Sequence, residues 1–163
     1  MKVIIVTGTP GTGKTTLAKQ LAKKLDFHYL GVNKIIKEHN ISEGYDIKRD
    51  TEIVDTRKLN IVLIKEINNH KNKGMIIDSH LSHYLPKRYV DVCIVTKCDL
   101  KELEARLRKK DYSRAKVKEN LDSEIFDICL NEAKERKHEV FVINTSKGIN
   151  INEISRKIRL KQI

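Results

Sequence analysis

Aromatic residues make up only 5% of this 163-residue sequence, and tryptophan is absent. No segment resembles an RNA-reading motif with paired aromatic side chains, so we do not expect sequence-specific recognition of RNA. No apolar stretch approaches the roughly 18 residues that a membrane-spanning helix needs. We therefore expect a chain that does not contact a membrane.

Cysteine is also scarce. Cys93, Cys98 and Cys129 are an odd number of cysteines without CxxC spacing, which argues against a disulfide framework and against a zinc site. Cys93 lies in an apolar run, where we expect a buried thiol. The opening "MKVIIV" leads directly into a glycine-rich loop, so we expect no signal peptide and a cytoplasmic location.

Acidic residues are fewer than basic ones. The chain has 33 Lys and Arg and 22 Asp and Glu, which gives a formal net charge of +11. Such a charge favours polyanionic partners, such as RNA, phosphates or an acidic protein surface. The alternative is a lysine-rich surface that only keeps the chain soluble. Basic residues near the end of the chain contribute to this excess: Lys134, Arg136, Lys137, His138, Arg156, Lys157, Arg159 and Lys161.

Strand-like and helix-like segments alternate along the chain. The expected strands cover residues 2–7, 27–30, 75–79, 90–96 and 140–144, and the expected helices cover residues 14–25, 51–73, 99–109, 116–136 and the segment from 150 onward. Asp99 with Glu102 and Asn150 with Glu153 have the spacing of capping boxes. This alternation predicts a single-domain, three-layer α/β fold whose parallel sheet is covered on both faces.

The stretch "GTPGTGKT" matches the pattern G-x-x-x-x-G-K-[ST] and lies between the first strand and the first helix. Its glycines, Gly8, Gly11 and Gly13, let the backbone N–H groups point inward at phosphate oxygens. Lys14 would bridge the β- and γ-phosphates of a nucleotide, and the Thr15 hydroxyl would bind Mg²⁺. We therefore predict that the chain binds ATP or GTP.

A carboxylate partner for the metal follows the third expected strand, in "MIIDSH". Asp78 stands at the carboxyl end of that strand, where a second Mg²⁺-organising group belongs; the alternative is a residue that caps the strand end. His80 lies at the same sheet edge. It either positions water or moves a proton, or it is structural.

Two longer segments remain. Residues 106–118, "RLRKKDYSRAKVK", hold seven basic residues and one acidic residue, and they are either a flap that closes over phosphates or a solvated face. Residues 31–57, with a turn expected at Gly44, are either the place of an acceptor nucleotide or an ordinary helical insertion.

The stretches "TKCD" at 96–99 and "TSK" at 145–147 resemble the guanine-reading signatures of GTPases. A GTPase switch would have glycine three residues after Asp78, and this chain has Leu81 there. The basic segment also lies between the two stretches. We therefore regard a GTPase as the weaker alternative.

Together these residues resemble the adenylate kinase isoenzyme 6 family, also called the coilin-interacting nuclear ATPase family, which has archaeal members. The resemblance covers nearly the whole chain and rests on "TGTPGTGKTT", "EGYD", "IIDSH", "LPKRY" and "DYSRAKVKENLDSEIF". It implies a nucleoside-monophosphate kinase fold, phosphoryl transfer from ATP to AMP or another monophosphate, and a slow ATPase. It also implies a role in small ribosomal subunit maturation through a platform ribosomal protein.

The resemblance also suggests roles for particular residues. Residues 31–54 would bind the monophosphate, and residues 109–119 would form the lid. Catalysis would involve Lys14, Asp78, His80, Arg106 and Lys110; Mg²⁺ would bind Thr15 and Asp78; ATP would contact Gly8, Gly11, Gly13, Lys14, Thr15, Thr16 and Lys110.

One position departs from the family pattern, because the lid arginine that usually precedes the Gly-Tyr or Asp-Tyr step is Lys110 here. Lysine lacks the planar, bidentate contact of arginine, and Arg106, Arg108 or Arg114 would have to compensate. We expect a monomer that uses ATP and Mg²⁺ and makes non-specific contact with rRNA. The rival hypothesis is an assembly factor whose ATP cycle moves a partner on or off, with incidental kinase activity.

Overall fold

Seven strands and seven helices form within residues 1–160, the part of the chain that the computed structural model describes. The strands are β1 Lys2–Gly8, β2 His28–Gly31, β3 Ser42–Asp46, β4 Thr51–Val54, β5 Gly74–Asp78, β6 Val92–Lys97 and β7 Val140–Asn144. The helices are α1 Lys14–Leu25, α2 Val32–Glu38, α3 Thr56–Asn69, α4 Leu100–Arg108, α5 Arg114–Ile125, α6 Ile128–Glu135 and α7 Ile151–Arg159, with short 3₁₀ helices η1 Ser82–Tyr84 and η2 Lys87–Tyr89.

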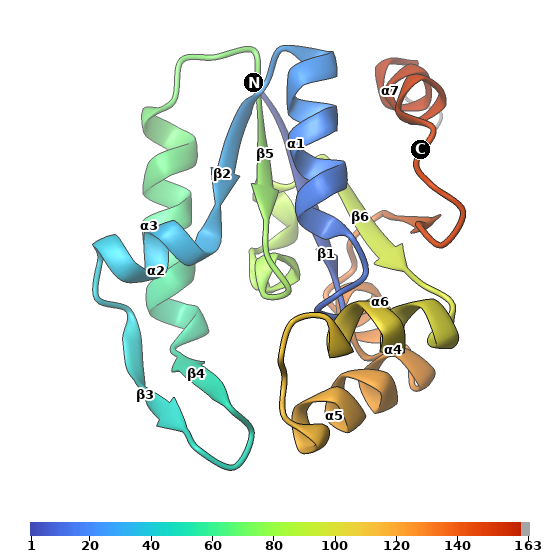
Figure 1. The fold of residues 1–163 in the computed structure, drawn as a ribbon. Coiled ribbons are helices and arrows are strands. Elements are labelled where there is room, and N and C mark those ends of the chain that lie inside the picture. The colour runs from blue at the N-terminus through green and yellow to red at the C-terminus, as the bar shows by residue number, and fades with distance from the viewer. Residues whose placement is uncertain (161–163) are drawn as a thin grey trace.

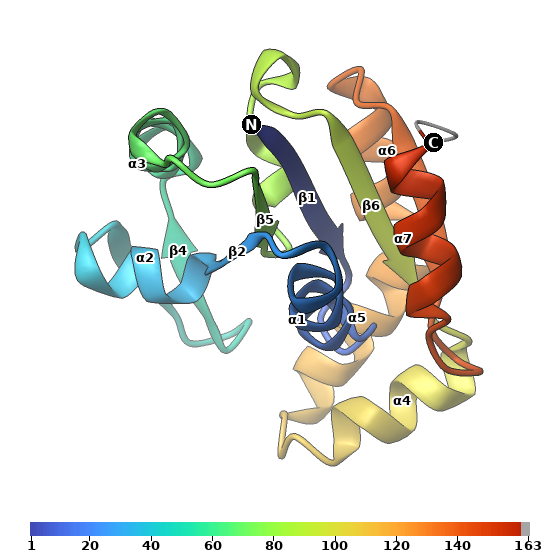
Figure 2. The same cartoon turned by 90° about the horizontal axis from the view of Figure 1, so that it is seen from above.

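Five strands form one parallel sheet in the order β2-β5-β1-β6-β7. Strand β1 lies in the middle, and its side chains are buried on both faces, as a continuous apolar run predicts. Val3 and Ile5 pack toward α3 and α6, whereas Ile4 and Val6 pack toward α1 and α7. Figure 2 shows these helices on the two sides of the sheet. The predicted three-layer α/β fold is confirmed.

The carboxyl ends of the parallel strands lie at one edge of the sheet, and two projections extend there (Figure 1). One is the antiparallel hairpin of β3 and β4, which follows α2. The other is the pair α4 and α5, held by a small apolar cluster of Cys98, Leu103, Leu107 and Val117. The projections correspond to the segments for which sequence analysis had left two interpretations open.

The hairpin corrects two predictions. Residues 51–54 were expected to begin a long helix, but they form β4, and the helix starts only after Asp55, whose carboxylate accepts N–H bonds from Arg57 and Lys58. The expected turn at Gly44 is wrong as well, since Gly44 lies inside β3 at a shift in strand pairing. The turn covers residues 47–50, where the Asp46 carboxylate accepts N–H bonds from two of them.

The expected helix over 116–136 is two helices. Asp127 adopts a left-handed conformation with φ of 52°, which interrupts the helical hydrogen bonds between α5 and α6. The Lys97 ammonium, at the end of β6, contacts the Asp127 carboxylate and lies 3.1 Å from the Glu124 carboxylate. The break therefore depends on a contact from a distant strand, which helical periodicity does not reveal.

Two smaller predictions also change. Asp99 precedes α4 but does not cap it with its side chain, because that carboxylate accepts a bond from Asn144 instead. The Asn150 cap of α7 is confirmed. His138 was grouped with the surface cations, yet it is buried and its Nε2 pairs with the carbonyl of His83. Lys161 lies outside the described residues.

Candidate active site

The loop between β1 and α1 folds as its glycines require. Gly8 has a φ of 141°, and a Cβ there would come within 2.6 Å of the Thr96 carbonyl oxygen. Behind the loop, the buried Thr12 hydroxyl pairs with the Thr96 hydroxyl at 2.7 Å, and the Thr12 carbonyl accepts from Thr145 at 2.8 Å. The threonines fix the back of the loop and leave its front open to the cleft.

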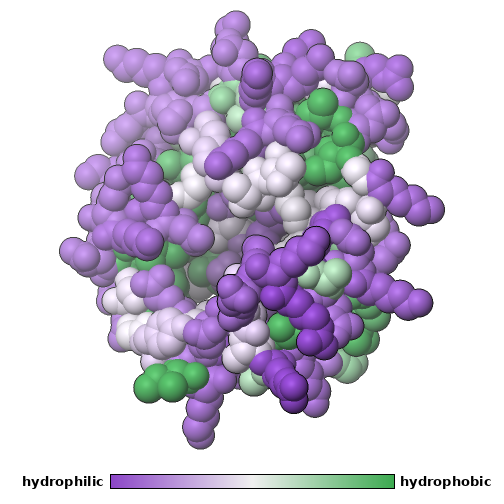
Figure 3. Space-filling model, in the orientation of Figure 1, coloured by the Kyte–Doolittle hydropathy of each residue, from purple (hydrophilic) through white to green (hydrophobic). Residues whose placement is uncertain are grey.

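That cleft has a volume of about 1020 Å³ and lies between the two projections. Figure 3 shows a hollow near the centre of a face otherwise covered largely by hydrophilic side chains. Of the residues predicted to form the site, all but Gly8 line the cleft: Gly11, Gly13, Lys14, Thr15, Thr16, Asp78, His80, Arg106 and Lys110. Gly8 lies behind the loop, where it allows the close approach to β6.

Lys14 lies at the floor of the cleft. Its ammonium donates to the Thr9 carbonyl at 2.9 Å. Because the surrounding walls remove water from it, burial lowers the pKa of Lys14 from its ordinary value of 10.5 to about 8. Phosphate oxygens at this position would stabilise the charged form of the ammonium. The residues present therefore fit a nucleoside triphosphate.

The two predicted metal-binding side chains are in contact. The Thr15 hydroxyl donates to Asp78 Oδ2 at 2.7 Å, and the Tyr29 hydroxyl donates to the same oxygen at 2.9 Å. Burial and the Asp78 carboxylate raise the pKa of Tyr29, which keeps its proton. A hydroxyl and a carboxylate beside a phosphate cradle are oxygen ligands of the kind Mg²⁺ takes in nucleotide sites. The donor set therefore fits Mg²⁺, and Tyr29 is an addition that sequence analysis missed.

His80 lines the cleft, and part of its side chain is exposed to solvent there. Desolvation by the protein atoms around the ring, together with the nearby Lys14, His83 and Lys116, lowers the pKa of His80 to about 4. The imidazole is therefore neutral at physiological pH, with one nitrogen able to donate and one able to accept. Both the water-positioning and the proton-transfer interpretations are compatible with this state.

Arg106 and Lys110 form part of the wall on the side of α4. The Arg106 guanidinium donates to the hydroxyl and carbonyl of Thr145, at 3.1 and 3.2 Å, and to Glu102 at 2.8 Å. Arg106 thus joins α4 to the loop after β7, and its catalytic role stays a prediction. Lys110 lies 5.9 Å from the centre of the Tyr112 ring.

The two projections contact each other over the mouth of the cleft. Lys116 of α5 donates to the carbonyl of Asp50 in the hairpin turn and lies 3.7 Å from its carboxylate. Arg49 lies 3.6 Å from Glu119. Residues 31–54 and 109–119 therefore face each other, as a monophosphate-binding segment and a lid would.

No cluster of three or more His, Cys, Asp or Glu side chains suited to a metal forms among residues 1–160. Likewise, none of the helices described there is long and apolar enough to span a membrane.

The two stretches that resemble guanine-reading motifs are in contact, because the Asp99 N–H donates to the Ser146 hydroxyl.

The fold and this cleft define a P-loop kinase. The family profile described as "AAA domain" matches residues 4–127. The chain is 37% identical over 139 residues to the adenylate kinase isoenzyme 6 homolog of Caenorhabditis elegans, covering 85% of this chain and 76% of that protein. It is 34% identical over 155 residues to the homolog of the same name from Dictyostelium discoideum, covering 92% and 85%.

The chain belongs to the adenylate kinase isoenzyme 6 family, whose members are adenylate-kinase-like P-loop nucleotide kinases. The fold is also similar to that of deoxyadenosine kinase from M. mycoides with bound dATP, with a TM-score of 0.62 at 16% identity over 98% of this chain and 100% of that one. The resemblance predicted from the sequence is confirmed, and the GTPase alternative is not supported.

Proposed function

We propose that this chain transfers the terminal phosphoryl group of ATP to AMP, with Mg²⁺, and forms two molecules of ADP. The main support for this proposal is the cleft, which has a volume of about 1020 Å³ and is lined by residues on both sides of the phosphate loop. Toward α4 and the loop after β7, Arg106, Thr145 and Ile149 would surround the base of ATP. Toward the hairpin, Asn33 and Thr51 would surround the acceptor. Each reactive phosphate would then meet Lys14 and the lid cations.

An assay of ATP with each nucleoside monophosphate in turn tests this proposal. We expect ATP consumption to rise strongly with AMP and to yield two ADP for each ATP. If none of the monophosphates accelerates ATP consumption, the chain is not a monophosphate kinase, and the rival assembly-factor hypothesis gains support.

We also propose a slow ATPase in which water takes the place of the acceptor and His80 orients it. His80→Ala should lower the ATP hydrolysis rate by about tenfold to a hundredfold, since removing a group that positions the attacking water typically costs this much. Binding of ATP, measured by calorimetry, should change less than twofold. An unchanged hydrolysis rate would make His80 structural, and a parallel loss of ATP binding would make it a ligand of ATP.

We further propose a role in small ribosomal subunit maturation, through a platform ribosomal protein and non-specific rRNA contact. The net charge of +11 supports this role, together with exposed cations on α7 and at the end of α6: Lys134, Lys137, Arg156 and Arg159. Because phosphate contacts release counterions, association should weaken steeply between about 50 and 200 mM salt.

A pull-down from ribosomal extracts over that salt range, with and without ATP, measures the effect. We expect small-subunit components to be retained at low salt and lost at high salt, with ATP changing the amount. Absence of both ribosomal protein and rRNA at low salt would leave a metabolic kinase.

A further inference from the structure

Three carboxylates line the cleft, and only two of them have a clear task. Asp78 holds Thr15 and Tyr29, and Glu119 pairs with Arg49. The third, Glu132 on α6, has a side chain that is 32% exposed and lines the cleft. No Lys or Arg pairs with its carboxylate in the described part of the chain. A carboxylate without a directly paired cation in a cleft for phosphates opposes anion binding, and such a group requires an explanation.

Glu132 is held in place by two side chains of η1. The Tyr84 hydroxyl donates to Oε1 at 3.1 Å, and His83 Nε2 lies 2.8 Å from Oε2. The Tyr84 ring is itself fixed, with the His83 ring centroid 4.7 Å away and the Arg136 guanidinium 4.0 Å from its centre. The position of the carboxylate is therefore defined before any ligand arrives.

The hydrogen bonds around His83 are consistent with one protonation state. His83 is buried, and burial lowers its pKa, although Glu132 opposes that shift. A neutral ring whose Nε2–H donates to Glu132 leaves Nδ1 as an acceptor, and the Thr7 hydroxyl lies 2.8 Å from that nitrogen. In this arrangement Thr7 and His83 orient Glu132, while each of its oxygens retains capacity to accept a further bond.

Apolar and aromatic side chains line the cleft together with Glu132. They are Leu81, Tyr84 and Ile128, and the Tyr84 hydroxyl bonds to Glu132 directly, whereas the cations that line the cleft include Lys14, Lys110 and Lys116. A fixed carboxylate bonded to an aromatic side chain suits the nucleoside part of a nucleotide, because the base packs against apolar and aromatic surface and its donors meet the carboxylate. Phosphate would be repelled there.

We propose that Glu132 is a specificity-determining residue that accepts a hydrogen bond from the nucleoside part of the acceptor, through a ribose hydroxyl or a base amino group, and that His83 and Tyr84 position it. The inference rests on the proposed function, since it assumes that the acceptor is a nucleoside monophosphate. It assigns to Glu132 the selection of the acceptor and no part in the transfer itself.

The test compares Glu132→Gln with the parent chain. Replacing a charged acceptor by a neutral amide weakens the hydrogen bond and should raise the KM for AMP by about three- to thirtyfold, with the KM for ATP changed less than twofold. Glu135→Gln is the matched control, because it removes the same charge from an exposed position on the same helix. Tyr84→Phe, which keeps the ring and removes one bond to Glu132, should raise the KM for AMP by a smaller factor.

Two altered acceptors distinguish the donors. If the donor is a ribose hydroxyl, Glu132→Gln should lose its effect on 2′,3′-dideoxy-AMP, which lacks both hydroxyls; if it is the base amino group, the effect should disappear with purine riboside monophosphate, which lacks that group. Equilibrium binding of AMP and both analogues without ATP gives a readout that does not depend on turnover. Thermal unfolding of each variant checks that the fold is retained.

The outcomes separate this inference from the proposed function. If the parent chain transfers phosphate to AMP and Glu132→Gln binds AMP as the parent does, the inference is wrong and the function stands. An equal rise in the KM for ATP and AMP also overturns it, because Glu132 would then act on the whole cleft. If the parent binds AMP without transferring phosphate to it, the function fails while the binding data still decide the role of Glu132.

Discussion

Replacing Lys14 by alanine should lower the rate of phosphoryl transfer by at least about a hundredfold. Lys14 is the cation at the floor of the cleft, where it donates to the Thr9 carbonyl and the P-loop pattern predicts contact with the β- and γ-phosphates. Negative charge shifts between phosphate oxygens during transfer, and removing a fixed cation that meets it typically costs several kcal/mol of transition-state stabilisation. Kinase and ATPase rates should fall together.

The rate is measured as steady-state ADP formation with saturating ATP, AMP and Mg²⁺. Lys23→Ala serves as the control, because Lys23 is an exposed lysine on the same helix. The unfolding temperature of Lys14→Ala should be close to that of the parent chain. Burial of the Lys14 ammonium is unfavourable without a ligand, so its removal should not destabilise the fold. A turnover near that of the parent would contradict the assignment of this cleft as the active site.

Asp78→Asn should have an effect of similar size, about a hundredfold or more on kcat. The substitution keeps the shape of a side chain buried at the end of β5 but removes the charge that would organise Mg²⁺ with Thr15. We expect half-maximal activity to require a higher Mg²⁺ concentration than in the parent chain. A titration of activity with Mg²⁺ at fixed ATP measures both the rate and this shift.

Tyr29→Phe is the matched control for Asp78. It removes one hydrogen bond to Oδ2 at 2.9 Å and leaves the carboxylate charged, so we expect a loss below about tenfold. If Asp78→Asn retained the Mg²⁺ dependence of the parent chain, the metal would have to bind elsewhere, and Asp78 would be a residue that caps the strand end.

The buried strands and α1 were predictable because local sequence decides them. Continuous apolar runs are required where both faces of a strand are covered, and the helix expected from Lys14 to Leu25 has those bounds. The hairpin was not predictable, because β3 and β4 are largely exposed and pair only with each other. A short polar strand carries little periodicity.

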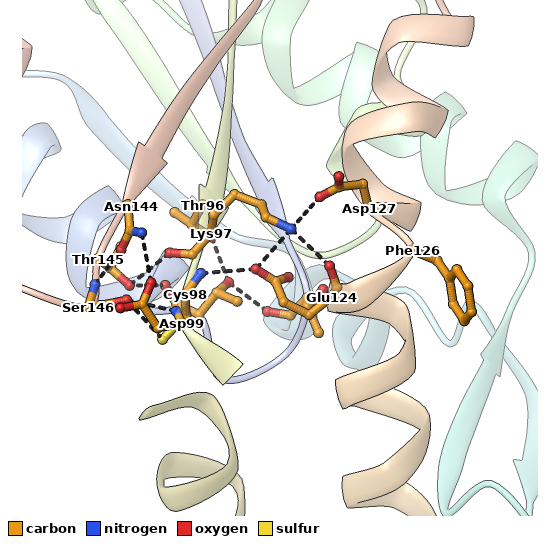
Figure 4. A network of polar contacts seen from close by, with 12 residues as sticks. Thr96, Lys97, Cys98, Asp99, Glu124, Phe126, Asp127, Asn144, Thr145 and Ser146 are labelled. Carbon is orange, nitrogen blue, oxygen red and sulfur yellow. Dashed lines mark hydrogen bonds and ion pairs between the residues drawn. The ribbon is translucent and has the colours of Figure 1, made fainter. Parts of the chain in front are cut away.

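The division between α5 and α6 depends on contacts that are distant in sequence. Figure 4 shows Lys97 between Glu124 and Asp127, with Phe126 pointing away from this network. Glu124 also accepts the N–H of Cys98 at 2.9 Å, which joins the helix to the end of β6. Helical propensity alone favours one continuous helix here, and tertiary contact overrides it.

The same reason limited the prediction of the site. The phosphate loop and Asp78 lie in short motifs, so their residues could be named from spacing. Tyr29 reaches Asp78 because β2 lies next to β5 in the sheet, although the two strands are far apart in the chain. Glu132 is held in the cleft by hydrogen bonds from η1, which lies about fifty residues earlier in the chain. Strand order and helix packing, which no local pattern encodes, bring these side chains together.

The contact between the hairpin turn and α5 has a consequence for how substrates enter. Among residues 1–160, the polar links between these two projections are Lys116 with Asp50 and Arg49 with Glu119. Three of these four side chains are more than 40% exposed, and such pairs contribute about 1 kcal/mol or less each. The two links together therefore favour the closed mouth by about 2 kcal/mol or less. Separating the hairpin turn from α5 would therefore break few and weak polar links, so opening the mouth to substrates would cost little free energy.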